Sequence, residues 1–256
     1  MTVQGLILAA GRGSRMGGLT ETAPKCLAEL AGSSLLSWQL KALNRAGLSQ
    51  VAAVGGYKKQ LLEPHVPLAA INEQWAETNM VRSLMCTAPL LTQNTCLISY
   101  SDIVYHFGIV ATLLKIEADV AIVYDRDWES LWRVRFLNPL EDAETFQQER
   151  GWLTEIGGAT ENMGDIEGQY IGLLKFTPRG WGNIKEIMAT LPDETVRTLD
   201  MTGLIRLSLA QGLKIAVAPI EGRWCEVDSQ SDLDVYETCL AKAEQDGTKW
   251  SHDWRW

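Results

Sequence analysis

The amino-acid sequence predicts an α/β fold in which a doubly wound, mostly parallel sheet carries helices on both faces. Two observations support this prediction. Apolar runs of strand length alternate with stretches of helical periodicity through the first half of the chain. The first apolar run also leads directly into a glycine-rich loop, and ligands of open α/β sheets bind at such carboxyl ends of strands.

The first half, up to about residue 125, is predicted to consist of βαβ units. The expected strands cover residues 3–9, 51–55, 95–100 and 120–124, and the expected helices cover residues 35–46, 80–91 and 107–116. Parallel strands joined by crossover helices are buried on both sides, which explains why these runs are apolar throughout. The predicted architecture is therefore Rossmann-like.

The second half, about residues 126–245, is less regular and is expected to extend the same sheet and to form a smaller lid. Candidate strands cover residues 132–136, 152–156, 170–176 and 213–218, and candidate helices cover residues 182–189, 201–211 and 231–243. The polar and acidic segment 138–150 is expected to be a mobile or hairpin excursion. Because no repeat or low-complexity linker interrupts the chain, residues 1–256 are predicted to form a single domain.

The tail, residues 246–256, contains Trp250, Trp254 and Trp256 outside any amphipathic pattern. These indoles predict that the tail docks on the body of the protein or on a neighbouring subunit, and a partly frayed terminus is the alternative. The sequence leaves the oligomeric state open between a monomer and a homodimer.

Composition and charge argue against several classes of protein. The 23 basic and 32 acidic residues give a net charge of −9, so nucleic acid is not an expected partner. The five cysteines lack CxxC spacing, which indicates neither a disulfide framework nor a zinc site and favours a cytoplasmic location. The apolar run at residues 6–10 is too short to span a bilayer, so no membrane insertion is expected. A polyanionic substrate would therefore need cations that the site supplies locally.

The loop after the first expected strand reads LAAGRGSRMG over residues 8–17 and is followed by Pro24 and Lys25. Gly11 and Gly13 allow the backbone to approach phosphate oxygens, and the small side chains before them leave space for a planar base. Arg15 and Lys25 supply positive charge for a triphosphate. A Walker loop is excluded because no Gly-Lys-Ser/Thr follows, and the dinucleotide fingerprint is excluded because methionine occupies its third small position.

This loop, with Thr20 and the Pro-Lys pair at the same spacing, resembles the N-terminal signature of the sugar-phosphate nucleotidyltransferase superfamily. The resemblance implies that the loop wraps a nucleoside triphosphate, and it assigns catalytic roles to Arg15 and Lys25, of which the lysine also steadies the transferred α-phosphate. The residues that it implies for nucleotide binding in this segment are Leu8, Ala9, Ala10, Gly11, Gly13, Arg15 and Lys25.

Two aspartates at the ends of expected strands, Asp102 and Asp228, are candidate ligands for Mg²⁺. A divalent ion would reduce the repulsion between an acceptor anion and the α-phosphate, and magnesium prefers carboxylate oxygens. An aspartate after a strand can instead cap a helix. The superfamily resemblance implies a metal-binding aspartate at both places, and we expect the two residues to meet across the glycine loop.

A narrower resemblance, which covers nearly the whole chain, is to the choline-phosphate and phosphonate cytidylyltransferase branch. It rests on residues 72–75 with 78–84, on residues 100–102, on residues 123–127 with Trp132, and on residues 224–232. The branch uses CTP, which implies that Asn79 and Ser83 contact the nucleotide. Asn79 could instead cap the helix that begins there.

The residues expected to bind the acceptor lie in the second half. The resemblance places an aromatic side chain at Trp132, with ordinary core packing as the alternative, and Glu129, Glu167 and Tyr170 could add negative charge and a ring edge. Arg133, with Arg135, would project from one face of the expected strand and grip a phosphate or phosphonate, although a solvated face or an ion pair with Glu129 explains the pattern equally well. No tyrosine pair occurs near residues 200–202, so a choline cage is incomplete.

The predicted reaction is magnesium-dependent transfer of CMP from CTP to a small phosphorylated or phosphonate acceptor of the phosphocholine or 2-aminoethylphosphonate type, with release of pyrophosphate. The acceptor oxygen is already ionised, so no enzyme nucleophile or histidine base is required. A sugar-1-phosphate nucleotidyltransferase is the alternative, and a non-catalytic nucleotide-binding protein is a second one.

Overall fold

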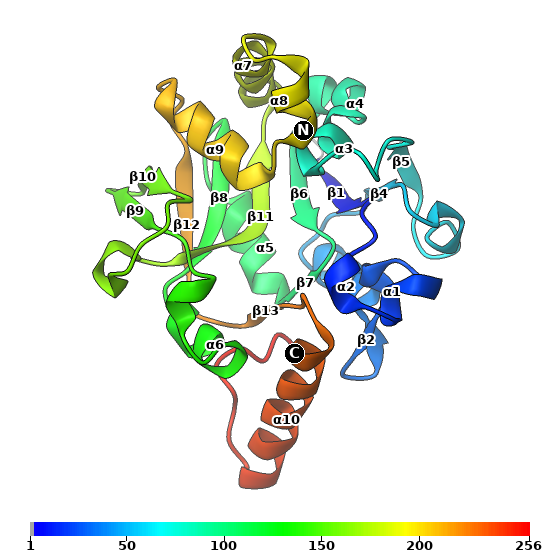
Figure 1. The fold of residues 1–256 in the computed structure, drawn as a ribbon, viewed down its shortest axis with the longest axis vertical. Coiled ribbons are helices and arrows are strands. Elements are labelled where there is room, and N and C mark those ends of the chain that lie inside the picture. The colour runs from blue at the N-terminus through cyan, green and yellow to red at the C-terminus, as the bar shows by residue number, and fades with distance from the viewer. Residues whose placement is uncertain (1–2) are drawn as a thin grey trace.

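The structure is a computed structural model that describes residues 3–256, and within them a nine-stranded sheet forms the centre of the molecule (Figure 1). The strand order is β5-β4-β1-β6-β11-β8-β12-β10-β9. The strands are β1 (Gln4–Ala9), β4 (Val51–Gly55), β5 (Leu68–Ile71), β6 (Cys96–Tyr100), β8 (Val120–Asp125), β9 (Phe146–Glu149), β10 (Trp152–Ile156), β11 (Gln169–Phe176) and β12 (Ala216–Ile220). β5, β4, β1 and β6 are parallel neighbours, as are β8 and β12, whereas β11 runs antiparallel between β6 and β8.

Alternating residues of β1 enter two different hydrophobic cores, one on each face of the sheet. Leu6 and Leu8 belong to one core, and Ile7 and Ala9 belong to the other. Helices α2 (Leu35–Arg45) and α5 (Phe107–Leu114) cover the second face, and α7 (Pro178–Ala189) and α9 (Met201–Ala210) cover the first. This two-sided burial requires apolar residues at every position of a central strand. The predicted doubly wound α/β fold is confirmed.

The expected helix over residues 80–91 consists of two short helices, α3 (Met80–Met85) and α4 (Ala88–Gln93). Pro89 lies in the first turn of α4, where its missing N–H breaks no intrahelical hydrogen bond, so the helix restarts there. The remaining helices are α1 (Leu19–Thr22), α6 (Trp128–Arg135), α8 (Asp193–Thr198) and α10 (Gln230–Asp246). Within residues 3–256, none of the helices has both the length and the apolar character that crossing a bilayer would require.

The expected strand over residues 132–136 is wrong, because these residues belong mostly to helix α6. The alternation of two arginines with Val134 and Phe136 imitates a strand. Over a longer window, Trp128, Leu131 and Trp132 are the buried residues of this segment, and their spacing of three and four is that of a helix face. Segment 138–150, in contrast, contains strand β9, which pairs antiparallel with β10. Of the two expectations for this segment, a mobile excursion or a hairpin, the hairpin is confirmed.

A short two-stranded ribbon that the sequence does not reveal joins distant parts of the chain. β7 (Ile103–Tyr105) pairs antiparallel with β13 (Trp224–Glu226). The remaining short pair, β2 (Glu29–Leu30) with β3 (Ser33–Ser34), lies after the glycine loop. The β7–β13 ribbon determines the site, because the residues that flank its two strands must lie side by side.

The C-terminal tail docks on the body of the protein. His252 and Trp254 have no exposed surface, and the Trp254 ring contacts Trp38 edge-to-face at 6.1 Å between centroids. The imidazole of His252 lies 3.0 Å from the carboxylate of Asp125, a buried residue at the end of β8 that also accepts a hydrogen bond from the Trp224 indole. Of the expectations for this segment, docking on the body is the one that the structure bears out.

Replacing Trp254 with alanine should lower the free energy of unfolding by about 3–5 kcal/mol, because it empties a fully buried indole site. Urea denaturation measures the change. Trp256→Ala is the matched control: its side chain is 43% exposed, so the loss should be much smaller. Equal losses in the two variants would contradict the docking of Trp254.

Candidate active site

The glycine loop is shaped around the side chain of Lys25. Gly13 has φ of 74°, a conformation that favours glycine, and a Cβ atom there would lie 2.7 Å from Cβ of Lys25. The aliphatic part of the lysine therefore passes against the loop backbone where a larger residue would collide. Pro24 has an extended conformation and begins the turn Lys25–Leu27, which directs the lysine below the loop.

The ammonium group of Lys25 lies between the two predicted metal aspartates. Nζ is 2.9 Å from Oδ2 of Asp102 and 2.8 Å from Oδ1 of Asp228, and Arg15 also contacts Asp228 at 2.9 Å. Burial disfavours the charged lysine, but the two carboxylates outweigh it and raise the pKa of Lys25. Burial likewise opposes the ionisation of Asp228, and Lys25, Arg15 and Arg135 outweigh it, so the pKa of Asp228 is lowered. Both partners therefore stay charged.

The β7–β13 ribbon and its supports bring these aspartates together. Asp102 lies in the turn between β6 and β7, and its carbonyl accepts a hydrogen bond from the Val227 N–H at 2.9 Å. Gln39 of α2 donates from its amide to the carbonyls on both sides of this turn. On the other strand, the Asp228 N–H donates to Asp232, which forms a capping box with Ser229 at the start of α10.

A cavity of about 170 Å³ opens beside the loop and collects most of the residues predicted to bind the nucleotide. Its lining residues are Leu8, Ala10, Gly11, Gly13, Arg15, Lys25, Trp75, Thr78, Asn79, Met80, Ser83, Ser101 and Asp102. Ala9 is absent from this lining and packs in the core behind it. Four of these lining residues were not predicted as site residues, although all four lie in the motif segments that carry the narrower resemblance: Trp75, Thr78, Met80 and Ser101.

Asn79 and Ser83 also hold the wall of the cavity in place. Asn79 caps α3 through its side-chain oxygen, which accepts from the Met80 N–H at 2.7 Å, and its amide donates to the Thr198 carbonyl. Ser83 is buried and its hydroxyl accepts from Asn72 at 3.0 Å. Asn79 thus has the capping role that was the alternative, and it borders the cavity as well.

The carboxylate chemistry fits a magnesium ion. Oδ1 of Asp102 is buried and has no hydrogen-bond partner within residues 3–256, which leaves a hard oxygen available to a cation. Within the same residues no three or more His, Cys, Asp and Glu side chains gather as a metal cage. Magnesium commonly takes one or two carboxylates together with phosphate oxygens and waters.

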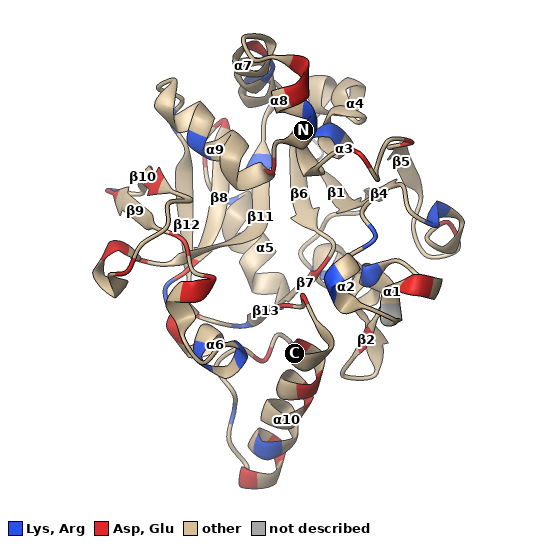
Figure 2. Ribbon diagram, in the orientation of Figure 1, with Lys and Arg blue, Asp and Glu red and all other residues tan. Residues whose placement is uncertain are grey.

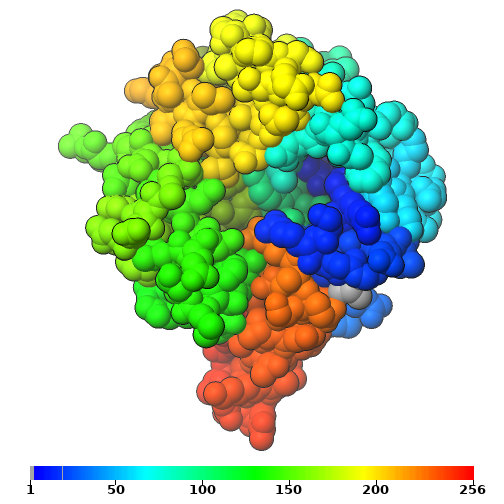
Figure 3. Space-filling view, in the orientation of Figure 1, coloured from blue at the N-terminus to red at the C-terminus, as the bar shows by residue number. Residues whose placement is uncertain are grey.

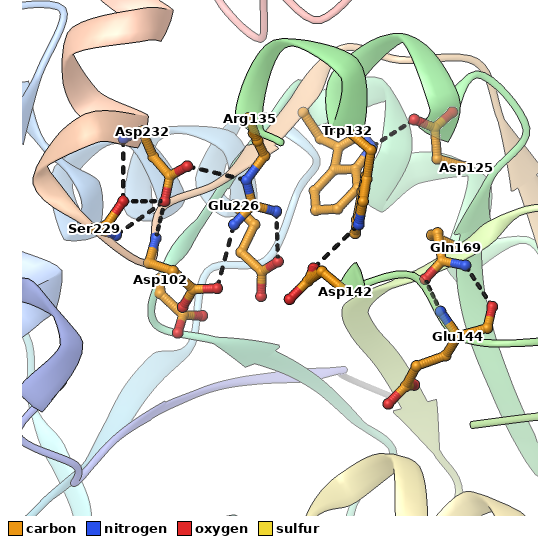
Figure 4. A network of polar contacts seen from close by, with 12 residues as sticks. Asp102, Asp125, Trp132, Arg135, Asp142, Glu144, Gln169, Glu226, Ser229 and Asp232 are labelled. Atoms are coloured by element: carbon orange, nitrogen blue, oxygen red, sulfur yellow. Dashed lines mark hydrogen bonds and ion pairs between the residues drawn. The ribbon is translucent and has the colours of Figure 1, made fainter. Parts of the chain in front are cut away.

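Arg135 is a central group of the site that sequence reasoning assigned elsewhere. Its side chain is fully buried and contacts three carboxylates: Glu226 at 3.1 Å, Asp228 at 3.2 Å and Asp232 at 3.1 Å (Figure 4). It therefore does not project toward an acceptor from a strand. Burial of Glu226 and the charge of Asp228, opposed by Arg135, raise the pKa of Glu226 to about 7.

In the metal-free protein, Glu226 should make the free energy of unfolding fall as pH rises from 4.5 to 7. Over this range the folded state retains a proton that the unfolded glutamic acid has released, and the contribution of Glu226 is at most about 3 kcal/mol. Glutamine cannot release a proton. Glu226→Gln should therefore gain stability relative to the wild type between pH 5 and pH 8. Urea unfolding at both pH values measures this, and a difference that stays constant would contradict the raised pKa.

The five residues predicted to bind the acceptor lie in different environments. Trp132 is buried, packs against Trp224 and donates its indole N–H to Asp142 at 3.1 Å. Arg133 is exposed and pairs with Glu129 one helical turn earlier, at 2.7 Å, and Glu167 accepts hydrogen bonds from Gln148. Within the described chain, no hydrogen bond, ion pair or aromatic contact joins Trp132, Arg133, Glu129 or Glu167 to Tyr170.

Tyr170 instead forms a pair with Tyr100, which lies two residues before Asp102. The ring centroids are 5.8 Å apart and the rings meet edge-to-face. Gly172, with φ of 79°, creates this space, because a Cβ atom there would lie 2.5 Å from the Tyr100 ring. A tyrosine pair therefore exists, but it comes from β6 and β11 and could not be found by searching near residue 200.

Acidic groups lie next to this tyrosine pair. Burial is the main cause that raises the pKa of Tyr100, and the charges of Asp102 and Asp200 add to it. Glu144 is exposed, but desolvation by the protein around it and the charges of Asp200 and Asp142 outweigh Arg206 and raise its pKa. Figure 3 shows a hollow in this face, bounded by the blue loop after β1, the green segment around α6, the yellow segments around α8 and the orange segment before α10. Basic and acidic residues are interspersed over the same face (Figure 2).

A glycine loop, a buried lysine and two aspartates at the carboxyl ends of sheet strands define the protein as a nucleotidyltransferase. Residues 5–160 match the family described as the MobA-like NTP transferase domain. The chain belongs to this family.

Relatives and solved structures show how closely it matches known proteins. The chain is 33% identical over 246 residues to the CTP:phosphoglutamine cytidylyltransferase of Campylobacter jejuni, covering 90% of this chain and 97% of that one. It is also 33% identical to the 2-aminoethylphosphonate cytidylyltransferase of Lancefieldella rimae, over 39% of this chain and 42% of that one. Its fold matches the inositol-1-phosphate CTP transferase of T. maritima with a TM-score of 0.70, at 17% identity over 97% of this chain and 98% of that one. The CTP:phosphocholine cytidylyltransferase of Streptococcus pneumoniae matches with a TM-score of 0.67, at 20% identity over 94% of this chain and all of that one.

Proposed function

We propose that the protein transfers CMP from CTP to a small phosphorylated acceptor that carries a positively charged nitrogen, and releases pyrophosphate. The observation that carries this proposal is the placement of Lys25 between Asp102 and Asp228, beside the glycine loop. The two carboxylates could bind a cation, and they lie with the ammonium group of Lys25 where a triphosphate would enter. The similarity to a cytidylyltransferase over 90% of the chain supports CTP as the nucleotide.

In this proposal the backbone of the glycine loop and Arg15 bind the β- and γ-phosphates, and Lys25 neutralises charge that develops on the α-phosphate. Asp102 and Asp228 would hold Mg²⁺, which supplies Lewis-acid stabilisation and orients the phosphates when it is bound. The acceptor oxygen is already an anion at neutral pH, so the residues around it position the reactants and exclude water. No side chain is required to form a covalent intermediate.

The acidic wall beside the tyrosine pair supports a cationic acceptor. Glu144, Asp142 and Asp200 are exposed and close enough for their charges to interact, and the charge of Arg206 offsets only part of this effect on Glu144. An ammonium group is attracted to such carboxylates and to the faces of tyrosine rings. Glutamine, choline and aminoethylphosphonate, which appear in the names of the relatives, all contain a nitrogen that is positively charged at neutral pH.

A substrate screen tests the proposal by pyrophosphate release with Mg²⁺ present. CTP is compared with UTP, GTP and dTTP, each with phosphocholine, 2-aminoethylphosphonate, phosphoglutamine and hexose-1-phosphates. Turnover should require CTP and one of the nitrogen-containing acceptors, and phosphorus NMR should show the pyrophosphate-linked product. Turnover of a hexose-1-phosphate with UTP or dTTP instead would identify a sugar-nucleotide synthesis and reject the proposed acceptor class.

Glu144→Gln should raise the KM for the nitrogen-containing acceptor about tenfold and leave the KM for CTP unchanged, since it removes one charge from the acceptor wall alone. Steady-state kinetics with each substrate varied in turn measures both constants. Glu141→Gln removes the same charge from a residue that is likewise exposed and lies three positions earlier, so it is the matched control and should change neither. An equal rise in both KM values would place Glu144 outside the acceptor site.

A further inference from the structure

Arg135 has the contacts of a residue that organises the carboxylates of the site from behind. Its guanidinium leaves the last turn of α6, is fully buried, and uses three different nitrogens for three different carboxylates. Nε contacts Asp232, one terminal nitrogen contacts Glu226 and the other contacts Asp228. In Figure 4, Arg135 points between Glu226 and Asp232 and toward the turn that carries Asp102.

The two oxygens of Asp228 face different partners. Oδ2 contacts Arg135 at 3.2 Å, whereas Oδ1 contacts Lys25 at 2.8 Å and Arg15 at 2.9 Å. Arg135 therefore holds one oxygen in the interior and leaves the other toward the cavity. Lys25 and Arg15 would also interact with a triphosphate, whereas Arg135 is enclosed by protein and has no route to the nucleotide.

The planar fork of arginine suits this position better than any other cation. It offers donors in fixed directions, and a lysine ammonium would be a single point charge at one of the three carboxylates. Asp232 also receives the Asp228 N–H at 2.8 Å, so the guanidinium and the capping box of α10 fix the backbone and side chain of Asp228 together. Loss of the guanidinium would leave several carboxylates close together with less positive charge among them.

We propose that Arg135 is the positioning residue of the metal–nucleotide site: it holds Asp228 in the orientation that binds Mg²⁺ with CTP, and it touches neither ligand. This inference rests on the proposed function. Groups that orient a metal ligand typically change metal affinity by about 10- to 100-fold when they are removed. The role differs from the acceptor-phosphate contact expected from a strand, so it predicts a change in metal affinity and no specific change in acceptor affinity.

The test measures Mn²⁺ binding to the full chain in the presence of CTP and without acceptor, by electron paramagnetic resonance of free Mn²⁺. Arg135→Lys and Arg135→Met should weaken Mn²⁺ binding about 10- to 100-fold. Where residual turnover allows, the KM for the acceptor should stay near the wild-type value while the Mg²⁺ concentration for half-maximal rate rises. Arg135→Lys keeps a positive charge and serves as the readable variant if Arg135→Met does not fold.

Two controls separate positioning from a general loss of stability. Arg179→Met removes an exposed arginine that pairs with Asp119, and it should bind Mn²⁺ as the wild type does. Trp181→Ala destabilises the protein by emptying a buried indole site in α7, which packs where β8 begins and therefore at the opposite end of the strands from the carboxylates, and it should also retain Mn²⁺ affinity. Wild-type affinity in both Arg135 variants would overturn the inference, and so would an equal loss in Trp181→Ala. Failure of the wild type itself to bind Mn²⁺ with CTP would reject the proposed function instead.

Discussion

Lys25→Met should lower kcat/KM for CTP by about 10³-fold, which corresponds to about 4 kcal/mol of lost transition-state stabilisation. The lysine is enclosed beneath the glycine loop and lies within hydrogen-bond distance of both aspartates. Methionine has a similar length and fills the same channel, so the substitution removes the charge and leaves the packing largely unchanged. Initial rates of pyrophosphate release at saturating acceptor measure the loss.

The same variant should reveal the electrostatic role of the lysine in the absence of substrate. Without the ammonium group, Asp102 and Asp228 repel each other, so the thermal midpoint should fall, and added Mg²⁺ should restore more of it than it adds to the wild type. Lys59→Met, which removes a half-buried lysine paired with Glu73, is the control and should retain wild-type rates. A Lys25→Met enzyme with more than a tenth of the wild-type kcat/KM would show that Lys25 does not stabilise the transition state.

Asp102→Asn should lower kcat by about 10²- to 10³-fold and should shift the Mg²⁺ requirement to higher concentrations. Asparagine keeps the shape and one oxygen but loses the negative charge, and the free Oδ1 of Asp102 is the oxygen best placed to accept a cation. Rates measured across a Mg²⁺ titration separate weaker metal binding from slower chemistry. Asp228→Asn should behave similarly, because its carboxylate contacts the same lysine.

The control for the aspartate variants is Asp193→Asn, which alters an exposed carboxylate on α8 and should keep the wild-type Mg²⁺ profile. Circular dichroism confirms that each variant is folded before its rates are compared. If Asp102→Asn kept the wild-type rate and the wild-type response to Mg²⁺, the carboxylate pair would have a structural role only, and the ion would have to bind through other residues.

Local chemistry made part of the site predictable. The glycines, the arginine and the Pro-Lys pair lie within 15 residues of one another, so their spacing after the first strand restricts what they can form. Because the net charge of the chain is negative, a bound triphosphate needs cations at the site itself. Arg15 in the glycine loop and Lys25 just after it are candidates for this role. The first-half strands were predictable for a similar reason, because strands buried on both faces must be apolar at successive positions.

The acceptor side was less predictable because it depends on contacts between distant segments. Residues 132–136 fit a strand pattern as well as a helix pattern, and only the packing of Trp128 and Trp132 against the core decides for the helix. Because the segment is a helix and not a strand, the two arginines do not share a face: Arg135 points into the interior and Arg133 points into solvent. The tyrosine pair likewise joins two strands through a bulge at Gly172 that no local motif announces.

The sequence by itself determined the doubly wound sheet, which follows from periodicity, and it predicted the glycine loop from its spacing and the two aspartates from the superfamily resemblance. Only the tertiary structure decided that Asp102 and Asp228 share one lysine and that Arg135 stands behind them. Those contacts depend on the β7–β13 ribbon, which pairs segments more than 100 residues apart. Such pairing forms only when the rest of the fold brings the two segments together and buries them. A strand of three residues is too short to show the alternation from which a strand is predicted.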